Sequence, residues 1–263
     1  MRPILARAEV VWNIPLGTHT AAICFYCPEV ASSAKPGQFV HLQLAPFLPR
    51  PFSIAAAGNG RICLIYQVIG PGTHDLRGRR EGHTVDLLGP LGKPFDPPAQ
   101  LNLVSVSGGV GLAGVSWLAL KQALSGRQAL IVHGQRSKHF MDVITAFECI
   151  RAATEMKGPM PAMLFATDDG SEGLKGTAVD LLASQWRAGP PGGIAVIGCG
   201  PRPMLSALKH FCLERQVPCF LSMEERMGCG IGACLGCAVP SASGGYFHVC
   251  KDGPVFPAEE VLI

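Results

Sequence analysis

The chain has few charges, few aromatic rings and no long apolar run. Of its 263 residues, 16% are Asp, Glu, Lys or Arg, the formal net charge is +3, and there are only three Trp and three Tyr. The chain has no Lys/Arg cluster to bind phosphates and few Trp and Tyr rings to stack on bases, so nucleic acid is not an expected partner. No apolar stretch approaches the roughly 18–20 residues of a membrane-spanning helix, and the N-terminal stretch lacks the apolar core of a secretory signal. We therefore expect a soluble, cytoplasmic protein without a membrane partner.

Cysteine, by contrast, is abundant, with 11 residues. An odd number of cysteines in a chain without an export signal indicates reduced thiols rather than a disulfide framework. Six fall in apolar strand or helix patterns and are expected to be small core residues: Cys24, Cys27, Cys63, Cys149, Cys212 and Cys219. The other five lie in glycine-rich segments, where a thiol can bind a metal or face a ligand.

The sequence pattern divides the chain into three regions. In residues 1–98, glycine and proline interrupt short alternating runs roughly every eight to twelve residues, a rhythm typical of an antiparallel barrel or sandwich. In residues 99–216, apolar strands alternate with helical patterns, which predicts a parallel α/β sheet of the nucleotide-binding type. Residues 217–263 pass from the run CFLSMEE into a glycine-rich segment with four cysteines.

The second region is regular enough to predict its elements. The expected strands are LNLVSVS (101–107), ALIVHG (129–134), AMLFAT (162–167) and GIAVIG (193–198). The expected helices are GLAGVSWLALKQAL (111–124), FMDVITAFECIRAATE (140–155), GTAVDLLASQW (176–186) and RPMLSALKHFCLERQ (202–216).

The most specific motif is GCGIGACLGCAV, followed later by a fourth cysteine. Its cysteines, Cys229, Cys234, Cys237 and Cys250, have the spacing C-x4-C-x2-C-x12-C. The first three match the plant-type ferredoxin loop, which holds a [2Fe-2S] cluster by four thiolates. The alternating glycines fit this chemistry, because the loop must wrap closely and direct backbone N–H groups at negatively charged sulfurs. The alternative is a zinc site, although zinc sites more often present their ligands as two short-spaced pairs.

Two glycine loops point to a dinucleotide. In SVSGGVGLAG, the residues Gly109, Gly111 and Gly114 satisfy G-x-G-x-x-G between a strand and a helix, so the helix N-terminus could receive a pyrophosphate. The acidic residue expected about 20 positions later is missing, and a turn that merely needs small residues remains the alternative. A second loop, GCGPRPML, follows the last strand, and both loops are expected at one crevice.

In the first region, the segments RPFSIA and GPGTHDL contain residue types that can bind a diphosphate. Arg50 provides charge, and Ser53 and Thr73 provide hydroxyls beside turns with free backbone amides. Ordinary hairpin ends are the alternative for both.

Several other residues allow two interpretations. Cys199 either lies near a nicotinamide or is a small residue in a tight turn. Arg136 either reaches an adenosine 2′-phosphate or lies in an exposed loop, and Asp168 and Asp169 either contact ribose or form a turn. Three residues before the cysteine loop are expected to form a solvated or interface face: Glu224, Glu225 and Arg226.

Taken in order, RPFS, IYQ, GPGT, SGGVG and GCGP resemble the ferredoxin-reductase superfamily. ATDDGSEGLKG at 166–176, ERMGCGIGACLGCAV and VCKDGPVF are similar to the iron–sulfur, FAD-binding electron-transfer subunits of heteromeric class 1B dihydroorotate dehydrogenases. The resemblance spans essentially the whole chain. It implies an antiparallel six-stranded FAD-binding barrel (1–98), a Rossmann-like NAD-binding α/β domain (99–216) and a small [2Fe-2S] loop domain (217–263).

The resemblance also implies site residues. Flavin contacts are expected at Arg50, Pro51, Phe52, Ser53, Ile65, Tyr66, Gln67, Gly72 and Thr73. NAD contacts are expected at Gly108, Gly109, Gly111, Gly198, Cys199, Gly200 and Pro201, and cluster ligands at Cys229, Cys234, Cys237 and Cys250. Gln67 departs from the family pattern, because relatives often have a basic residue there, and this puts one phosphate contact in doubt.

The implied function is electron transfer within a larger enzyme. Electrons from dihydroorotate would pass from FMN in a partner catalytic subunit through the [2Fe-2S] cluster and FAD to NAD+, in pyrimidine (UMP) biosynthesis, in a heterotetramer with two copies of each subunit. Two alternatives remain: the similar subunit of another complex, such as a ferredoxin:NADP oxidoreductase or a sulfide or hydrogenase-linked reductase, and a binding module with a zinc-bearing C-terminus.

Overall fold

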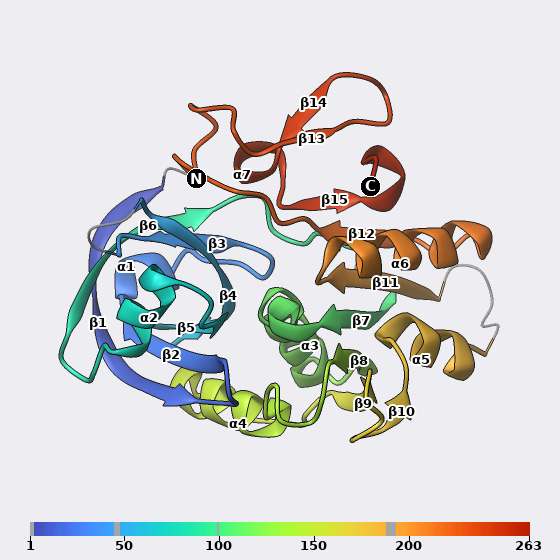
Figure 1. Cartoon of the computed structure of the whole chain (residues 1–263), viewed down its shortest axis with the longest axis horizontal. Helices are drawn as coiled ribbons and strands as arrows, with labels where there is room; N and C mark the ends of the chain where they lie inside the picture. The colour runs from blue at the N-terminus through green and yellow to red at the C-terminus, as the bar shows by residue number, and fades with distance from the viewer. Residues whose placement is uncertain (1–2, 45–47, 99, 188–192) are drawn as a thin grey trace.

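A computed structural model describes residues 3–44, 48–98, 100–187 and 193–263. A β-barrel lies beside an α/β sheet, and the C-terminal segment lies across the top of both (Figure 1). Within the described residues, no helix is both long and apolar enough to cross a bilayer. Ala99, with which the second predicted region begins, is outside the described residues.

The first region forms a closed antiparallel barrel with the strand order β1-β2-β5-β4-β3-β6, as predicted. Its strands are β1 (Ile4–Pro15), β2 (Thr20–Tyr26), β3 (Phe39–Leu42), β4 (Arg50–Gly58), β5 (Arg61–Gln67) and β6 (Thr84–Leu91). Two short helices, α1 (Pro28–Ala31) and α2 (Pro71–Arg77), interrupt the strand sequence. The sequence pattern predicted only a turn at α2.

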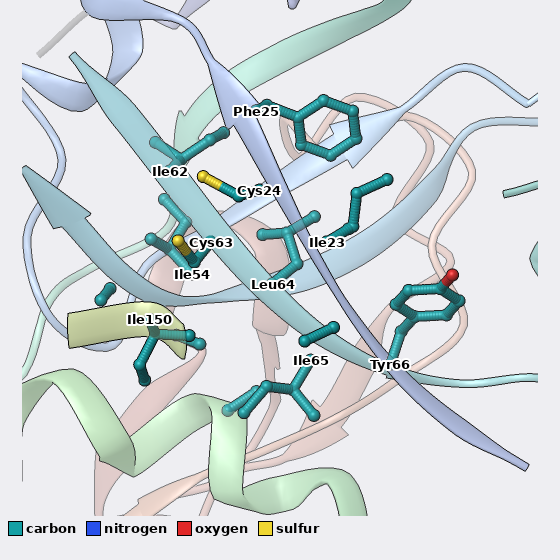
Figure 2. Close-up of a cluster of buried hydrophobic side chains, with 14 of the residues drawn as sticks. Ile23, Cys24, Phe25, Ile54, Ile62, Cys63, Leu64, Ile65, Tyr66 and Ile150 are labelled. Atoms are coloured by element: carbon teal, nitrogen blue, oxygen red, sulfur yellow. The ribbon is translucent and has the colours of Figure 1, made fainter. Parts of the chain in front are cut away.

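Strands β2 and β5 are apolar on both faces because both faces are covered. Their inward side chains fill the barrel, and α4 (Val143–Thr154) covers the outside, with Ile150 in the same cluster as Ile23 and Ile62 (Figure 2). Burial of each such side chain contributes roughly 1.5–3 kcal/mol. Five of the six predicted core cysteines are buried, and Cys149 on α4 is half-buried.

The second region forms a sheet with the order β10-β9-β8-β7-β11-β12-β15, parallel except for β15. Its strands are β7 (Asn102–Gly108), β8 (Ala129–Gln135), β9 (Ala162–Thr167), β10 (Leu174–Lys175), β11 (Ile194–Cys199), β12 (Cys219–Ser222) and β15 (Val255–Pro257). Its helices are α3 (Leu112–Leu124), α4, α5 (Ala178–Gln185) and α6 (Arg202–Glu214). The predicted strands and helices are therefore confirmed, while β12 and β15 extend the sheet beyond residue 216.

The C-terminal segment leaves this sheet after β12 and returns to it at β15. In between lie the cysteine loop, the hairpin β13 (Ala238–Pro240) and β14 (Tyr246–His248), and the short helix α7 (Val249–Asp252). The last residues are tied to α6, because Lys209 Nζ donates a hydrogen bond to the carbonyl of Val261.

Barrel and sheet are joined by a shared core and by specific hydrogen bonds. The hydroxyl of Ser116 on α3 donates to the carbonyl of Ala55 on β4 at 2.7 Å, in a fully buried contact. The N–H of Asp142, which caps α4, donates to the carbonyl of Leu16 on the barrel at 2.7 Å. These contacts hold the barrel against the α/β sheet.

The sheet contains a buried histidine that makes its stability dependent on pH. His133 on β8 is fully buried, its Nδ1 is 2.9 Å from the hydroxyl of Ser107, and burial lowers its pKa from 6.5 to about 4. Between these pH values the unfolded chain therefore binds a proton that the folded chain does not, and folding stability falls as the pH drops from 6.5 towards 4.

We expect His133 to lower the free energy of unfolding by about 3 kcal/mol as the pH falls from 7 to 4. Urea unfolding of the wild type and of His133→Leu at several pH values measures the effect. The free energy of unfolding of the variant should depend less steeply on pH than that of the wild type. Equal slopes for the two proteins would contradict the prediction.

Candidate functional site

A cavity of 330 Å³ opens on the side of the barrel that faces the sheet and the C-terminal segment. We call it the barrel cavity. Its wall contains all the predicted flavin residues except Gly72: Arg50, Pro51, Phe52, Ser53, Ile65, Tyr66, Gln67 and Thr73. Strands β4 and β5 provide most of them, so the motifs RPFS and IYQ lie side by side although they are separated in sequence.

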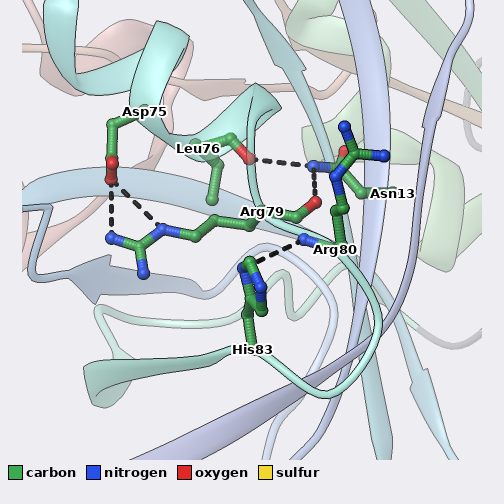
Figure 3. Close-up of polar contacts among 6 residues, drawn as sticks. All are labelled: Asn13, Asp75, Leu76, Arg79, Arg80 and His83. Atoms are coloured by element: carbon green, nitrogen blue, oxygen red, sulfur yellow. Dashed lines mark hydrogen bonds and ion pairs between the residues drawn. The ribbon is translucent and has the colours of Figure 1, made fainter.

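A half-buried asparagine, Asn13, positions α2, which contributes Thr73 to this wall. The side-chain amide of Asn13 donates to the carbonyls of Leu76 and Arg79 at the C-terminal end of α2, at 2.8 and 3.0 Å (Figure 3). Its Oδ1 accepts a hydrogen bond from Tyr66 at 2.9 Å. An ion pair between Arg79 and Asp75 adds to the same network.

Two predicted flavin residues are already engaged within the protein. The Thr73 hydroxyl oxygen accepts from the N–H groups of Ile69 and Gly70, which caps α2. Tyr66 is 2% exposed, burial raises its pKa to about 12, and its ring meets Phe52 edge-on at 6.2 Å. The polar groups of Thr73 and Tyr66 thus stabilise the cavity wall. What these two residues offer a ligand is chiefly apolar surface and backbone groups. Gly72 is buried in the first turn of α2.

A second cavity, of 460 Å³, lies at the carboxyl ends of the parallel strands. We call it the sheet cavity. Both glycine loops reach it, through Gly108, Gly109, Gly111, Gly200 and Pro201. The loops are in direct contact: a Cβ on Gly111 would lie 2.3 Å from the carbonyl oxygen of Cys199. Only glycine allows the two backbones to approach so closely.

Gly198 and Cys199 do not line this cavity. Gly198 packs under leucines of α6 and β12. The Cys199 side chain is fully buried against Gly114 of α3, and burial, followed by the charge of Glu224, raises its thiol pKa far above the usual value. Cys199 is the last residue of β11, and in this geometry its small side chain packs inside the protein rather than in the cavity wall.

The sheet cavity is also lined by three residues that the sequence pattern left ambiguous or did not single out. Arg136 and Asp168, which follow β8 and β9, belong to its wall, as does Phe140. Asp169 instead accepts a hydrogen bond from the N–H of Ser171 and closes a turn. The signal for Arg136 and Asp168 was their place just after parallel strands, where ligands of α/β sheets bind.

The two cavities adjoin. Gln67, Val110 and Glu224 belong to both walls. Glu224 is open to the cleft yet has protein on most sides, and this desolvation raises its pKa. Of the three residues predicted to form a solvated or interface face, Glu224 and Arg226 are exposed and Glu225 is half-buried. Glu224 and Glu225 also line the barrel cavity, and Glu225 is 3.8 Å from Arg202.

The cysteine loop lies next to the barrel cavity and brings its four thiols together as two pairs. The N–H of Cys234 donates to Cys229 Sγ at 3.3 Å. The sulfurs of Cys237 and Cys250 are 3.3 Å apart, and Cys250 Sγ also accepts the N–H of Gly232 at 3.0 Å. Cys237 and Cys250 are buried, whereas Cys234 is exposed.

The loop's backbone already favours a thiolate at one position. Burial opposes ionisation of Cys229, but the N–H groups of Ile231, Cys234 and Ala233 and the thiol of Cys234 outweigh it and lower its pKa to about 6. Burial, followed by the Cys237 thiol, raises the pKa of Cys250 to about 12. Burial thus disfavours a thiolate at Cys250.

The paired arrangement fits a binuclear iron–sulfur cluster. A zinc ion requires four ligands around one point, whereas two thiolates for each of two irons is the ligand set of a [2Fe-2S] cluster. The N–H groups directed at the sulfurs are the donors that such a cluster requires.

Comparisons with known proteins agree with these features. A family profile described as the iron-sulfur cluster binding domain of dihydroorotate dehydrogenase B matches residues 224–262. The dihydroorotate dehydrogenase B (NAD(+)) electron transfer subunit of Geobacillus thermodenitrificans is 38% identical over 98% of each chain. That of Desulforamulus reducens is 35% identical over 97% of each chain.

Solved structures share the architecture. That of the NADH-dependent reduced ferredoxin-NADP oxidoreductase matches with a TM-score of 0.82 and 28% identity, covering 98% of this chain and 90% of that one. A ferredoxin NADP+ reductase from Neisseria gonorrhoeae, with bound FAD and NADP, matches with a TM-score of 0.64 and 17% identity over 85% and 95% of the two chains; at this identity the likeness concerns the fold. Since full-length relatives are more than a third identical and the cysteine loop matches their cluster-binding domain, the chain belongs to the family of dihydroorotate dehydrogenase B (NAD(+)) electron transfer subunits.

Proposed function

We propose that this chain is the electron-transfer subunit of a cytoplasmic dihydroorotate dehydrogenase that reduces NAD+. The observation that carries the proposal is the cysteine loop beside the barrel cavity, with four thiols paired under backbone N–H donors. When bound, FAD exchanges two electrons with NAD(H) and single electrons with a [2Fe-2S] cluster. The partner is a catalytic subunit with FMN that oxidises dihydroorotate, in a heterotetramer with two copies of each subunit.

The barrel, residues 1–98, would hold the FAD. Arg50, whose guanidinium has no hydrogen-bond partner among the described residues, offers it to the diphosphate. Ser53 offers its hydroxyl to the flavin ring, and Phe52 an apolar face. Ile65, Tyr66, Gln67, Gly72 and Thr73 complete the wall and its supporting turn. Gln67, being neutral, offers hydrogen bonds in place of the charge that relatives often have.

The α/β region, residues 99–216, would hold NAD. Gly108, Gly109, Gly111, Gly200 and Pro201 form the floor for the dinucleotide, and Gly198 and Cys199 support that floor from below. Because Gln67, Val110 and Glu224 lie at the junction of the two cavities, a nicotinamide held there would face the flavin ring. NAD is preferred over NADP on the names of the relatives.

The C-terminal region, residues 217–263, would hold the cluster on Cys229, Cys234, Cys237 and Cys250. Cys229 and Cys234 would serve one iron, and Cys237 and Cys250 the other. Gly232 and the N–H groups around Cys229 would stabilise the negative charge on the sulfurs. The exposed side of the loop, at Cys234, is open to a partner.

Purification of the chain alone and with its genomic neighbour tests this proposal. We expect a brown protein with FAD, acid-labile sulfide and an EPR signal on reduction. NADH oxidation that depends on orotate should occur only when an FMN-containing, dihydroorotate-oxidising subunit co-purifies. A colourless protein loaded with zinc, or reduction of ferredoxin by the chain without any such partner, would contradict the proposal.

A further inference from the structure

A histidine of the barrel lies directly beneath the cysteine loop. His41 is on β3, where the side chains of Val40 and Leu42 point into the barrel core. The side chain of His41 therefore points outwards, where the C-terminal segment covers it and leaves it 3% exposed. Its neighbours in the sheet are Pro51 on β4 and Leu88 on β6.

The contact between this imidazole and the loop is close. A Cβ on Gly230, the residue after Cys229, would lie 2.9 Å from Nδ1 of His41. Gly230 also has a φ of +71°, a conformation that glycine adopts without strain. The backbone of the loop thus rests on the imidazole ring.

The same face of β3 also reaches the barrel cavity. Phe39, two residues before His41, lines that cavity and belongs to the apolar cluster that contains Cys237 and Cys250. Residues two apart on a strand are separated by roughly 7 Å. His41 therefore lies one strand repeat from the proposed flavin site and touches, at Gly230, the segment that carries the proposed cluster ligands.

The imidazole has a polar atom without a partner. Nε2 of His41 is buried and makes no hydrogen bond to any of the described residues. Burial lowers the pKa of His41 below its usual value and so favours the neutral ring. An unsatisfied buried group of this kind costs about 1–3 kcal/mol, and native proteins rarely retain one without a reason.

We propose that His41 is a positioning residue of the cysteine loop, whose ring supports the backbone at Gly230 and whose Nε2 donates a hydrogen bond to a sulfur of the bound cluster. This inference rests on the proposed function. Hydrogen bonds to the sulfurs of an iron–sulfur cluster stabilise its more negative, reduced state and so raise its reduction potential. Loss of the imidazole would lower that potential.

The test compares His41→Leu, His41→Gln and His41→Asn in the full chain containing FAD and cluster. The amide nitrogen of Gln can take the place of Nε2, whereas the shorter Asn reaches only the position of Nδ1. EPR-monitored redox titration gives the cluster potential, optical titration gives the flavin potential, and iron and sulfide assays give cluster content. His133→Leu is the matched control, because it removes an equally buried imidazole from β8, three strands away from β12.

We expect His41→Leu and His41→Asn to lower the equilibrium constant for cluster reduction about tenfold, which corresponds to ~59 mV for one electron. His41→Gln and His133→Leu should remain near the wild type, and the flavin potential should not move. If His41→Leu assembles no cluster, retention of iron by His41→Gln supports the proposal.

Three results would overturn it: an unchanged cluster potential in His41→Leu, loss of the cluster or an equal fall of its potential in His41→Gln, or a shift of the flavin potential in place of the cluster potential. Failure of the proposed function is recognised separately, because the wild type itself would then contain no iron–sulfur cluster.

Discussion

Replacing Cys250 by Ser is expected to abolish electron transfer to the catalytic subunit and to leave the reaction of FAD with NADH intact. The Cys250 sulfur is buried, paired with Cys237 at 3.3 Å and bonded by the N–H of Gly232. A serine hydroxyl is a poor, short substitute for a thiolate ligand of iron. Cys250 lines neither the barrel cavity nor the sheet cavity, so binding of FAD and NADH should continue.

The expected loss of orotate-dependent NADH oxidation exceeds about 100-fold, since removal of even an outer partner of a metal ligand can cost 10–100-fold. Iron and sulfide content, the EPR signal and NADH-dependent reduction of a soluble dye are the measurements. Cys149→Ser is the control, because this half-buried cysteine of α4 is not a predicted ligand. A Cys250→Ser protein with full iron content would remove Cys250 from the ligand set.

Gly111→Ala is expected to force the two glycine loops apart. Its Cβ would lie 2.3 Å from the carbonyl oxygen of Cys199 and 2.7 Å from the Cα of Gly200, and neither backbone atom can turn aside. Overpacking of this kind costs about 3 kcal/mol of unfolding free energy. Because both loops form the floor of the sheet cavity, affinity for NADH should fall at least about tenfold, the equivalent of 1.4 kcal/mol.

Urea unfolding and the KM for NADH in dye reduction measure these two effects. Gly78→Ala is the matched control, since Gly78 has a φ of −77° and the nearest atom to its Cβ position is at 3.3 Å. A Gly111→Ala protein with the stability and KM of the wild type would show that the loops can separate freely, against the close contact described above.

The fold could be predicted from the sequence where one physical rule dominates. Strands of the α/β region are buried on both faces, so their apolar runs are visible, and glycine loops mark the ends that bind ligands. The helix α2 was missed because its seven residues, PGTHDLR, have no apolar periodicity. Its stability comes from the Thr73 cap and from Asn13, a residue some 60 positions away in sequence.

The candidate site, like the fold, could be predicted only in part. Spacing predicted that four cysteines form one centre, but it could not show that they form the pairs Cys229/Cys234 and Cys237/Cys250, because pairing depends on how α7 returns to the loop. Glu224 was predicted to belong to a solvated or interface face, and it is exposed in the structure. Its position at the carboxyl end of β12 could be recognised only once β12 was known to belong to the sheet.

The antiparallel pairing of β12 with β15 has a consequence for the origin of such proteins. Ser222 is opposite Val255, so the chain departs from the sheet and rejoins it at facing positions, with their Cα atoms about 5 Å apart. Segments whose ends meet in this way are the ones that proteins most readily accept as insertions. The iron–sulfur segment thus has the geometry of an inserted module: a single deletion between β12 and β15 would remove the one-electron centre without changing the order of any other strand in the sheet.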